Sequence, residues 1–124
     1  MPRESHACPC CGHLVFGESA GSYEICPICF WEDDPVQAAD PWFAGGANKP
    51  SLVEAQRNYT AFGAMEQRFV KKVRPPRRGE TVDPRWRPLR DSDREHVTTP
   101  RDIEKAIQIS GVGPSYDYWL RSEK

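Results

Sequence analysis

The sequence predicts a small α+β domain in which a β-hairpin packs with two to three helices and an extended arm rich in proline and arginine. Three observations support this prediction: a length of 124 residues, two similar cysteine turns near the start, and helical periodicity from about residue 51. Hydrophobic residues make up only 38 % of the chain, and charged residues make up 28 %. The hydrophobic core is therefore expected to be thin and to need a further source of stability.

The composition also excludes several classes of protein. Four Trp, four Tyr and five Phe are more than a disordered chain usually carries. No stretch approaches the roughly 20 apolar residues of a membrane-spanning helix. The first four residues do not begin the apolar run of a signal peptide. We expect a soluble, cytoplasmic protein with no membrane partner.

Two short segments are predicted as the strands of the hairpin. They are residues 14–16 and 23–25, and the turn-forming residues 17–22 separate them. A two-stranded hairpin of this size is marginal in water. Something else must hold it in place.

The cysteines supply the strongest signal in the chain. Four of the five form two Cys-x2-Cys turns that are separated by 14 residues: Cys8, Cys11, Cys26 and Cys29. Two such turns, joined by a hairpin, can direct four sulfurs to the corners of a tetrahedron around Zn²⁺. This spacing predicts a zinc-ribbon-like hairpin, related to the rubredoxin knuckle, in which iron could occupy the same four thiolates. Because the protein supplies all four ligands, we expect a structural site rather than a catalytic one.

Two alternatives accompany the cysteine pattern. The four cysteines could form two disulfides, although a cytoplasmic compartment disfavours stable disulfides. Cys10 occupies a position within the first turn from which a side chain usually points outward. We expect it to be a bystander, and the alternative is a reactive thiol beside the metal.

The cysteine turns and the residues around them resemble the cysteine-rich CPCC domain family of small bacterial proteins. The resemblance covers about residues 8–76, and its matching segments are residues 8–12, 23–34, 45–48, 51–59 and 62–64. It implies a metal-binding domain, and it implies no known reaction.

Helix signals complete the predicted organisation. Ser51 and Glu54 form a capping box that starts a helix, which Gly63 either ends or bends. A helical pattern continues beyond it through Val73 until two prolines stop it. We therefore predict a metal-binding domain over residues 1–76, with the helix from about residue 51. An extended basic arm that does not pack is predicted over residues 77–98, and a C-terminal helical segment that packs on the same domain over residues 99–124. The aromatic side chains expected in the core are Trp31, Trp42, Tyr59, Phe62 and Phe69.

Charge is distributed unevenly along the chain. Residues 1–60 carry a net charge of −5, residues 61–90 carry +6 and residues 91–124 carry −2. Clustered arginines suit phosphate, and a tryptophan among them could stack on a base. Arginine and tryptophan are also favoured at protein interfaces. The candidate residues for a partner or for nucleic acid are Lys71, Lys72, Arg74, Arg77, Arg78, Arg85, Trp86 and Arg87.

Two further segments invite functional interpretations. The acidic residues 32–34 could bind a divalent metal or a basic peptide. We expect a solvated loop instead, because consecutive side chains point in different directions and rarely share one ligand. A glycine-rich loop precedes the helix at Ser51, and Asn48, Lys49 and Ser51 are a candidate anion site at the helix start. The alternative is that the glycines let the loop pass close to packed backbone.

Together these observations favour a non-catalytic zinc-binding protein whose four-cysteine structural site stabilises a protein-interaction module. One concrete form is an antitoxin-like or immunity-like partner. The first alternative is a nucleic-acid-binding zinc ribbon that uses the basic segment 68–90, and the second is a redox or metal-handling protein that uses Cys10. No nucleophile–base pairing and no paired catalytic carboxylates are recognisable, so we expect no enzyme.

Overall fold

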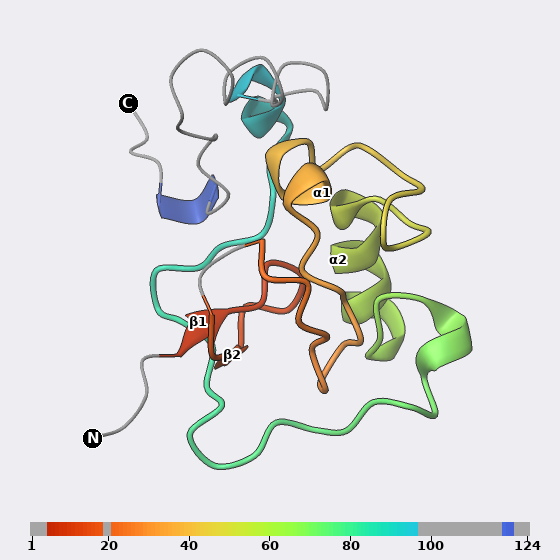
Figure 1. Ribbon diagram of the computed structural model, residues 1–124, viewed down its shortest axis with the longest axis vertical. Helices are drawn as coiled ribbons and strands as arrows, with labels where there is room; N and C mark the ends of the chain where they lie inside the picture. Colours follow the sequence, from red (N-terminus) through yellow and green to blue (C-terminus); the bar gives the residue numbers. More distant parts are fainter. Residues whose placement is uncertain (1–4, 19–20, 97–117, 121–124) are drawn as a thin grey trace.

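The computed structural model of the chain describes residues 5–18, 21–96 and 118–120. In chain order its elements are β1 (His6–Ala7), β2 (Leu14–Phe16), α1 (Pro35–Ala39), α2 (Leu52–Phe62) and the 3-10 turns η1 (Gln67–Phe69), η2 (Asp91–His96) and η3 (Tyr118–Leu120). The two helices lie on one side of the molecule and the hairpin lies on the other (Figure 1). This arrangement is compatible with the predicted small α+β, zinc-ribbon-like fold.

The hairpin pairs other segments than those predicted. β1 pairs antiparallel with β2, with His6 opposite Phe16 and Ala7 opposite Leu14, so the first cysteine turn lies between the two strands. The strand predicted over residues 14–16 is confirmed. The strand predicted over residues 23–25 is wrong, because this segment forms only an isolated bridge between Ile25 and Glu32 across the second cysteine turn. Each cysteine turn thus closes its own short loop, which costs less chain entropy than pairing the two turns with each other.

Helix α1 follows the second cysteine turn and was not predicted, since five residues are too few to show a helical period. Asp34 accepts a hydrogen bond from the backbone N–H of Val36, and Pro35 occupies the first helical position. Both features are standard for a helix start.

Helix α2 begins as the sequence predicts. The Ser51 hydroxyl accepts a hydrogen bond from the N–H of Glu54, and Gly63 closes the helix in the left-handed conformation with φ 83°. The helical pattern predicted from there to Val73 is wrong. The chain reverses after Gly63, the Asn58 side chain donates to the carbonyl of Met65, and only the short turn η1 follows.

The core is built around the cysteines. Trp31 and Leu52 are fully buried among them, and Tyr59 and Phe69 pack against this cluster from its edge. Trp42 and Phe62 are half-buried and lie outside the cluster, so their assignment to the core is wrong. Aromatic residues from the far end of the chain fill this space instead, since Tyr118 is 1 % exposed and Trp119 is 7 % exposed.

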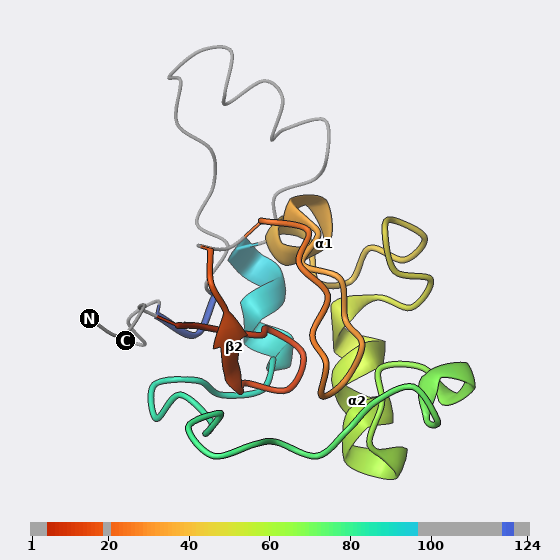
Figure 2. The ribbon, with the colours of Figure 1, turned by 60° about the horizontal axis from the view of Figure 1, so that its bottom comes forward.

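The segment after residue 80 packs against the first cysteine turn, so the expectation of an arm that does not pack is wrong for residues 81–93. Leu14 donates its N–H to the carbonyl of Thr81, and Asp83 donates its N–H to the carbonyl of Gly12. These bonds pair backbone groups that a two-stranded hairpin leaves open at its edge. Figures 1 and 2 show the segment passing beside the hairpin before it reaches η2.

The end of the chain contributes η3, which packs in the core. Of the C-terminal helical segment predicted over residues 99–124, the described part is the 3-10 turn Tyr118–Leu120. The helix predicted from Thr99 lies outside the described residues. Among the described residues, no helix is long and apolar enough to cross a membrane.

The packing of residues 81–93 can be tested with two glycines that both have positive φ. A Cβ atom at Gly12 would lie 2.5 Å from the ring of Trp86, whereas a Cβ atom at Gly79 would meet nothing within 4 Å. Gly79→Ala should cost about 1–2 kcal/mol for the left-handed backbone alone. Gly12→Ala should cost about 1–3 kcal/mol more through overpacking. Denaturant unfolding measures both free energies, and equal losses would contradict the packing of Trp86 on this turn.

Candidate metal centre

The two cysteine turns share one backbone geometry. The N–H of Gly12 donates to the carbonyl of Cys8 at 2.7 Å, and the N–H of Phe30 donates to the carbonyl of Cys26 at 2.8 Å. The last residue of each turn has a positive φ, 81° at Gly12 and 74° at Phe30. Glycine adopts this conformation freely, whereas at Phe30 it costs about 1–2 kcal/mol. The Phe30 ring packs 4.4 Å from that of Phe69, which offsets part of this cost.

This geometry brings four sulfurs together. The sulfur atoms of Cys8, Cys11, Cys26 and Cys29 all lie within 4.8 Å of one another. The Sγ atoms of Cys8 and Cys29 are 3.6 Å apart, and those of Cys11 and Cys26 are 3.7 Å apart. A tetrahedral ion with metal–sulfur bonds of about 2.3 Å requires about 3.8 Å between sulfurs. All five cysteines are free, so the alternative of two disulfides is not observed.

Burial makes a cation the natural occupant of this cluster. None of the four cysteines is more than 4 % exposed. Burial raises the pKa of Cys8 and of Cys29, whereas hydrogen bonds from neighbouring thiols, that of Cys26 first, lower the pKa of Cys11. Four thiolates in one buried space repel each other unless a metal ion balances their charge. The backbone N–H of Ile28 donates to Sγ of Cys26 at 3.4 Å, which suits a thiolate.

These residues fit a metal ion with four sulfur ligands. The donor set is typical of zinc or of iron–sulfur coordination. Among the described residues, the four cysteines are the whole ligand group, and no histidine or carboxylate joins it. The centre therefore has the donor set of a structural site.

Cys10 is not the outward-pointing bystander that the sequence suggested. Its side chain is 1 % exposed and belongs to the core cluster, although it is not among the four grouped sulfurs. Burial raises the pKa of its thiol. A redox role would require solvent access, and this thiol has almost none.

Half of the predicted basic surface is occupied by contacts within the protein. Arg74 pairs with Glu80 at 2.7 Å, and Arg87 pairs with Asp93 at 2.8 Å. Arg85 pairs likewise with Asp83 at 3.0 Å, and Trp86 donates from Nε1 to the carbonyl of Pro9 at 3.2 Å. Four cationic residues are exposed and form no ion pair with the described residues: Lys71, Lys72, Arg77 and Arg78. Nucleic-acid binding by this segment stays a prediction.

The acidic loop is not solvated, so that interpretation is wrong for Asp33 and Asp34. Asp33 accepts hydrogen bonds from the backbone N–H groups of Gly21 and Ser22. Asp34 caps α1 and also accepts from the N–H of Ala47 at 2.8 Å. Both carboxyl groups hold loops around the second cysteine turn.

The candidate anion site consists mainly of side chains that the fold already uses. Asn48 is 1 % exposed, and its amide both accepts from the N–H and donates to the carbonyl of Glu32, each at 2.8 Å. Ser51 caps α2, and Lys49 is exposed.

Gln37 contributes to the same network as Asn48. Its amide nitrogen donates to the carbonyls of Phe43, Asn48 and Pro50. Nothing in the spacing of Gln37 and Asn48 could have revealed this network. These contacts favour the structural interpretation of the loop.

The fold and the site define a class, that of small cysteine-rich domains organised around four grouped thiols. More particularly, the chain belongs to the cysteine-rich CPCC family, whose family model matches residues 6–80. The match contains both cysteine turns, α1 and α2, and ends just before the segment that packs on the first turn. No curated protein matches the chain.

Serine substitutions distinguish the four candidate metal ligands from Cys10. Cys26→Ser should abolish stoichiometric metal binding and cooperative thermal unfolding, because three thiolates hold a structural ion poorly. Cys10→Ser should keep one metal ion per chain and a cooperative transition. Elemental analysis and circular dichroism on both proteins measure these outcomes. Retention of metal by Cys26→Ser would contradict the four-sulfur assignment.

Alanine substitution tests the loop network against the anion site. Asn48→Ala should lower the free energy of unfolding by about 1–3 kcal/mol, because it leaves the part-buried N–H of Glu32 unpaired and removes one of the two donors to the Glu32 carbonyl. Lys49→Ala, at an exposed neighbour, should change it by less than about 0.5 kcal/mol. An anion site would instead give phosphate-dependent stabilisation of the wild-type protein that Lys49→Ala removes.

Proposed function

We propose that this protein is a non-catalytic zinc-binding protein whose four-cysteine centre stabilises a protein-interaction module. The observation that carries the proposal is the set of four buried sulfurs in tetrahedral spacing with no further ligand in the described chain. Such a set completes the coordination of zinc and leaves no position for a substrate. Bound zinc would supply a cross-link between the two cysteine turns.

A domain with a small core and little regular structure would depend on bound zinc for its stability. Structural zinc contributes on the order of 10–16 kcal/mol in small zinc domains, which exceeds the net stability of many domains. The two cysteine turns have little regular secondary structure of their own, with strands of two and three residues. We therefore assign the ion to folding rather than to chemistry.

The interaction role is supported by side chains that the core leaves exposed. Tyr23 is 54 % exposed, Ile25 50 %, Val82 44 % and Val70 40 %. Of these four, Tyr23 is of a residue type that is enriched at protein interfaces. We expect this protein itself to act in the bacterial cytoplasm as an antitoxin-like or immunity-like protein that binds a partner.

Metal analysis tests the identity of the ion. The protein purified without added metal should contain one zinc per chain, and its cobalt(II) form should show the absorption of tetrahedral thiolate coordination. Excess chelator should abolish the cooperative melting transition, and added zinc should restore it. If the protein contains one iron per chain, iron rather than zinc occupies the site. A metal-free protein that stays folded would contradict the structural role of the metal.

Capture from the native lysate tests the interaction role. The tagged protein, in moderate salt, should retain a protein partner in stoichiometric amount that nuclease treatment does not remove. Nuclease-sensitive nucleic acid without such a partner would favour the alternative of the basic segment. The matched variant for that alternative replaces Arg77 and Arg78 by Ala, which should reduce the salt dependence of nucleic-acid binding.

A further inference from the structure

A groove of about 290 Å³ lies between α2 and the segment that follows Trp86. Its apolar walls come from Trp42, from Val53 of α2 and from Leu89. The α2 wall lies within the family match at residues 6–80, and the Leu89 wall lies beyond it. The groove is thus formed where the family domain meets a segment outside the match.

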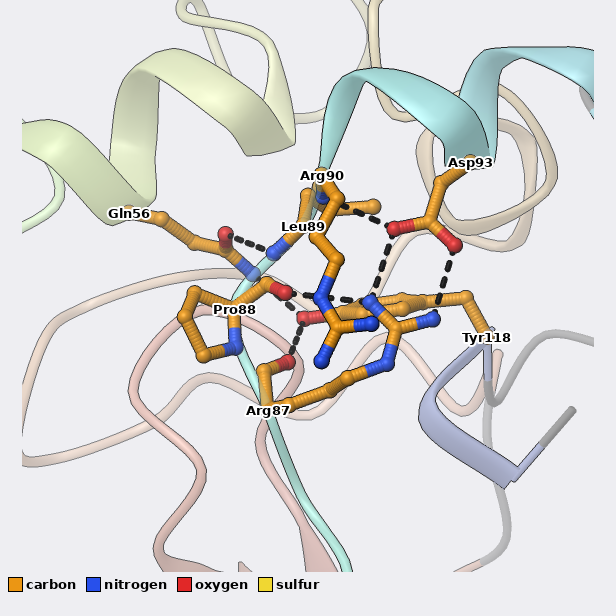
Figure 3. Close-up of polar contacts among 7 residues, drawn as sticks. All are labelled: Gln56, Arg87, Pro88, Leu89, Arg90, Asp93 and Tyr118. Atoms are coloured by element: carbon orange, nitrogen blue, oxygen red, sulfur yellow. Dashed lines mark hydrogen bonds and ion pairs between the residues drawn. The ribbon is translucent and has the colours of Figure 1, made fainter. Parts of the chain in front are cut away.

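Hydrogen bonds hold the two walls together. Gln56 of α2 accepts from the N–H of Leu89 at 2.9 Å, and its amide nitrogen donates to the carbonyl of Pro9 and to the hydroxyl of Tyr118. Figure 3 shows Gln56 reaching from α2 to the backbone beside Pro88, with the pair of Arg87 and Asp93 to the right of this backbone. Because these partners are buried or half-buried, the groove is preformed, and binding to it costs little ordering entropy.

The charges around the groove are mainly positive. Arg57 of α2 and Arg90 of the opposite wall line it, and among the described residues the only acidic side chain in its lining is Asp91. Arg57 is exposed and forms no ion pair with the described residues. The guanidinium of Arg94 lies 5.3 Å from the centre of the Trp42 ring, which places a further cation beside the apolar wall. An apolar centre between arginines suits an occupant that is apolar in one part and anionic in another.

We propose that this groove binds an acidic peptide segment of a protein partner. One large apolar side chain of the peptide enters between Trp42 and Leu89, and a flanking carboxylate contacts Arg57. The inference rests on the proposed interaction role and adds to it a face and a partner chemistry. At about 290 Å³ the groove is at the lower end of the range for small-molecule pockets, roughly 300–1,000 Å³, which suits a side chain better than a cofactor. The exposed cations of residues 71–78 do not line it, so a nucleic-acid backbone has no continuous track here.

The test uses the full-length, zinc-loaded protein and a displayed library of random twelve-residue peptides. Peptides selected on the wild type should be enriched in Asp and Glu around a Trp, Phe or Leu. Synthetic peptides from the selection should then bind with a Kd that Arg57→Glu raises at least tenfold and that higher salt also raises. Leu89→Ala should weaken the same peptides, because it removes the apolar wall but keeps the N–H that bonds Gln56.

Arg78→Glu is the matched control, since it makes the same charge change at an exposed arginine outside the groove. It should leave the Kd within about twofold, and zinc content and melting should show that every variant is folded. Equal binding by wild type and Arg57→Glu, selected peptides that are basic or uncharged, or no selected peptides at all would overturn the proposal. A native partner that wild type and Arg57→Glu capture equally would place the interaction on another face. This result would contradict the proposed role of the groove and would leave the proposed function intact.

Discussion

The convergence of four cysteine sulfurs in the core is the constraint on which the other contacts depend. Strands of two and three residues and a helix of five have too few internal hydrogen bonds to persist alone. The sulfurs fix both cysteine turns, and Trp31 and Leu52 then pack around them. Four sulfur ligands would complete the coordination of a tetrahedral ion, which would then hold the two cysteine turns together.

A second layer of contacts surrounds this centre and joins residues far apart in the chain. The carbonyl of Pro9 accepts from both Gln56 and Trp86, so the first cysteine turn is tied to α2 and to the segment beyond it. Gln56 extends the connection to Tyr118 near the end of the chain. Because these polar groups are largely buried, each bond removes a cost that an unpaired group would impose. The last described residues are therefore part of the same packed body as the first.

The family match covers the cysteine centre and the helices, and it does not cover the segment that packs on the first cysteine turn. Residues 6–80 contain the cysteine turns and both α-helices, and the segment that follows covers the first turn and builds one wall of the groove. A shared fold can carry different functional sites, so a segment outside the family match can add a surface of its own. The arginines differ in their surroundings, since Arg74, Arg85 and Arg87 are held by acidic neighbours, whereas Arg57 is exposed.

The grouping of the four cysteines and the start of α2 could be predicted from the sequence alone, because both depend on local rules. A Cys-x2-Cys turn directs its own sulfurs, and Ser51 caps the N–H groups next to it. The end of α2, the pairing of the hairpin, the burial of Cys10 and the roles of Asp33, Asp34 and Asn48 became visible only in the folded protein. Each of these depends on partners distant in the chain or on competition between loops of similar length, which spacing does not encode. Trp86 also depends on distant partners. The sequence suggests that it could stack on a base, whereas in the structure its ring packs against Gly12.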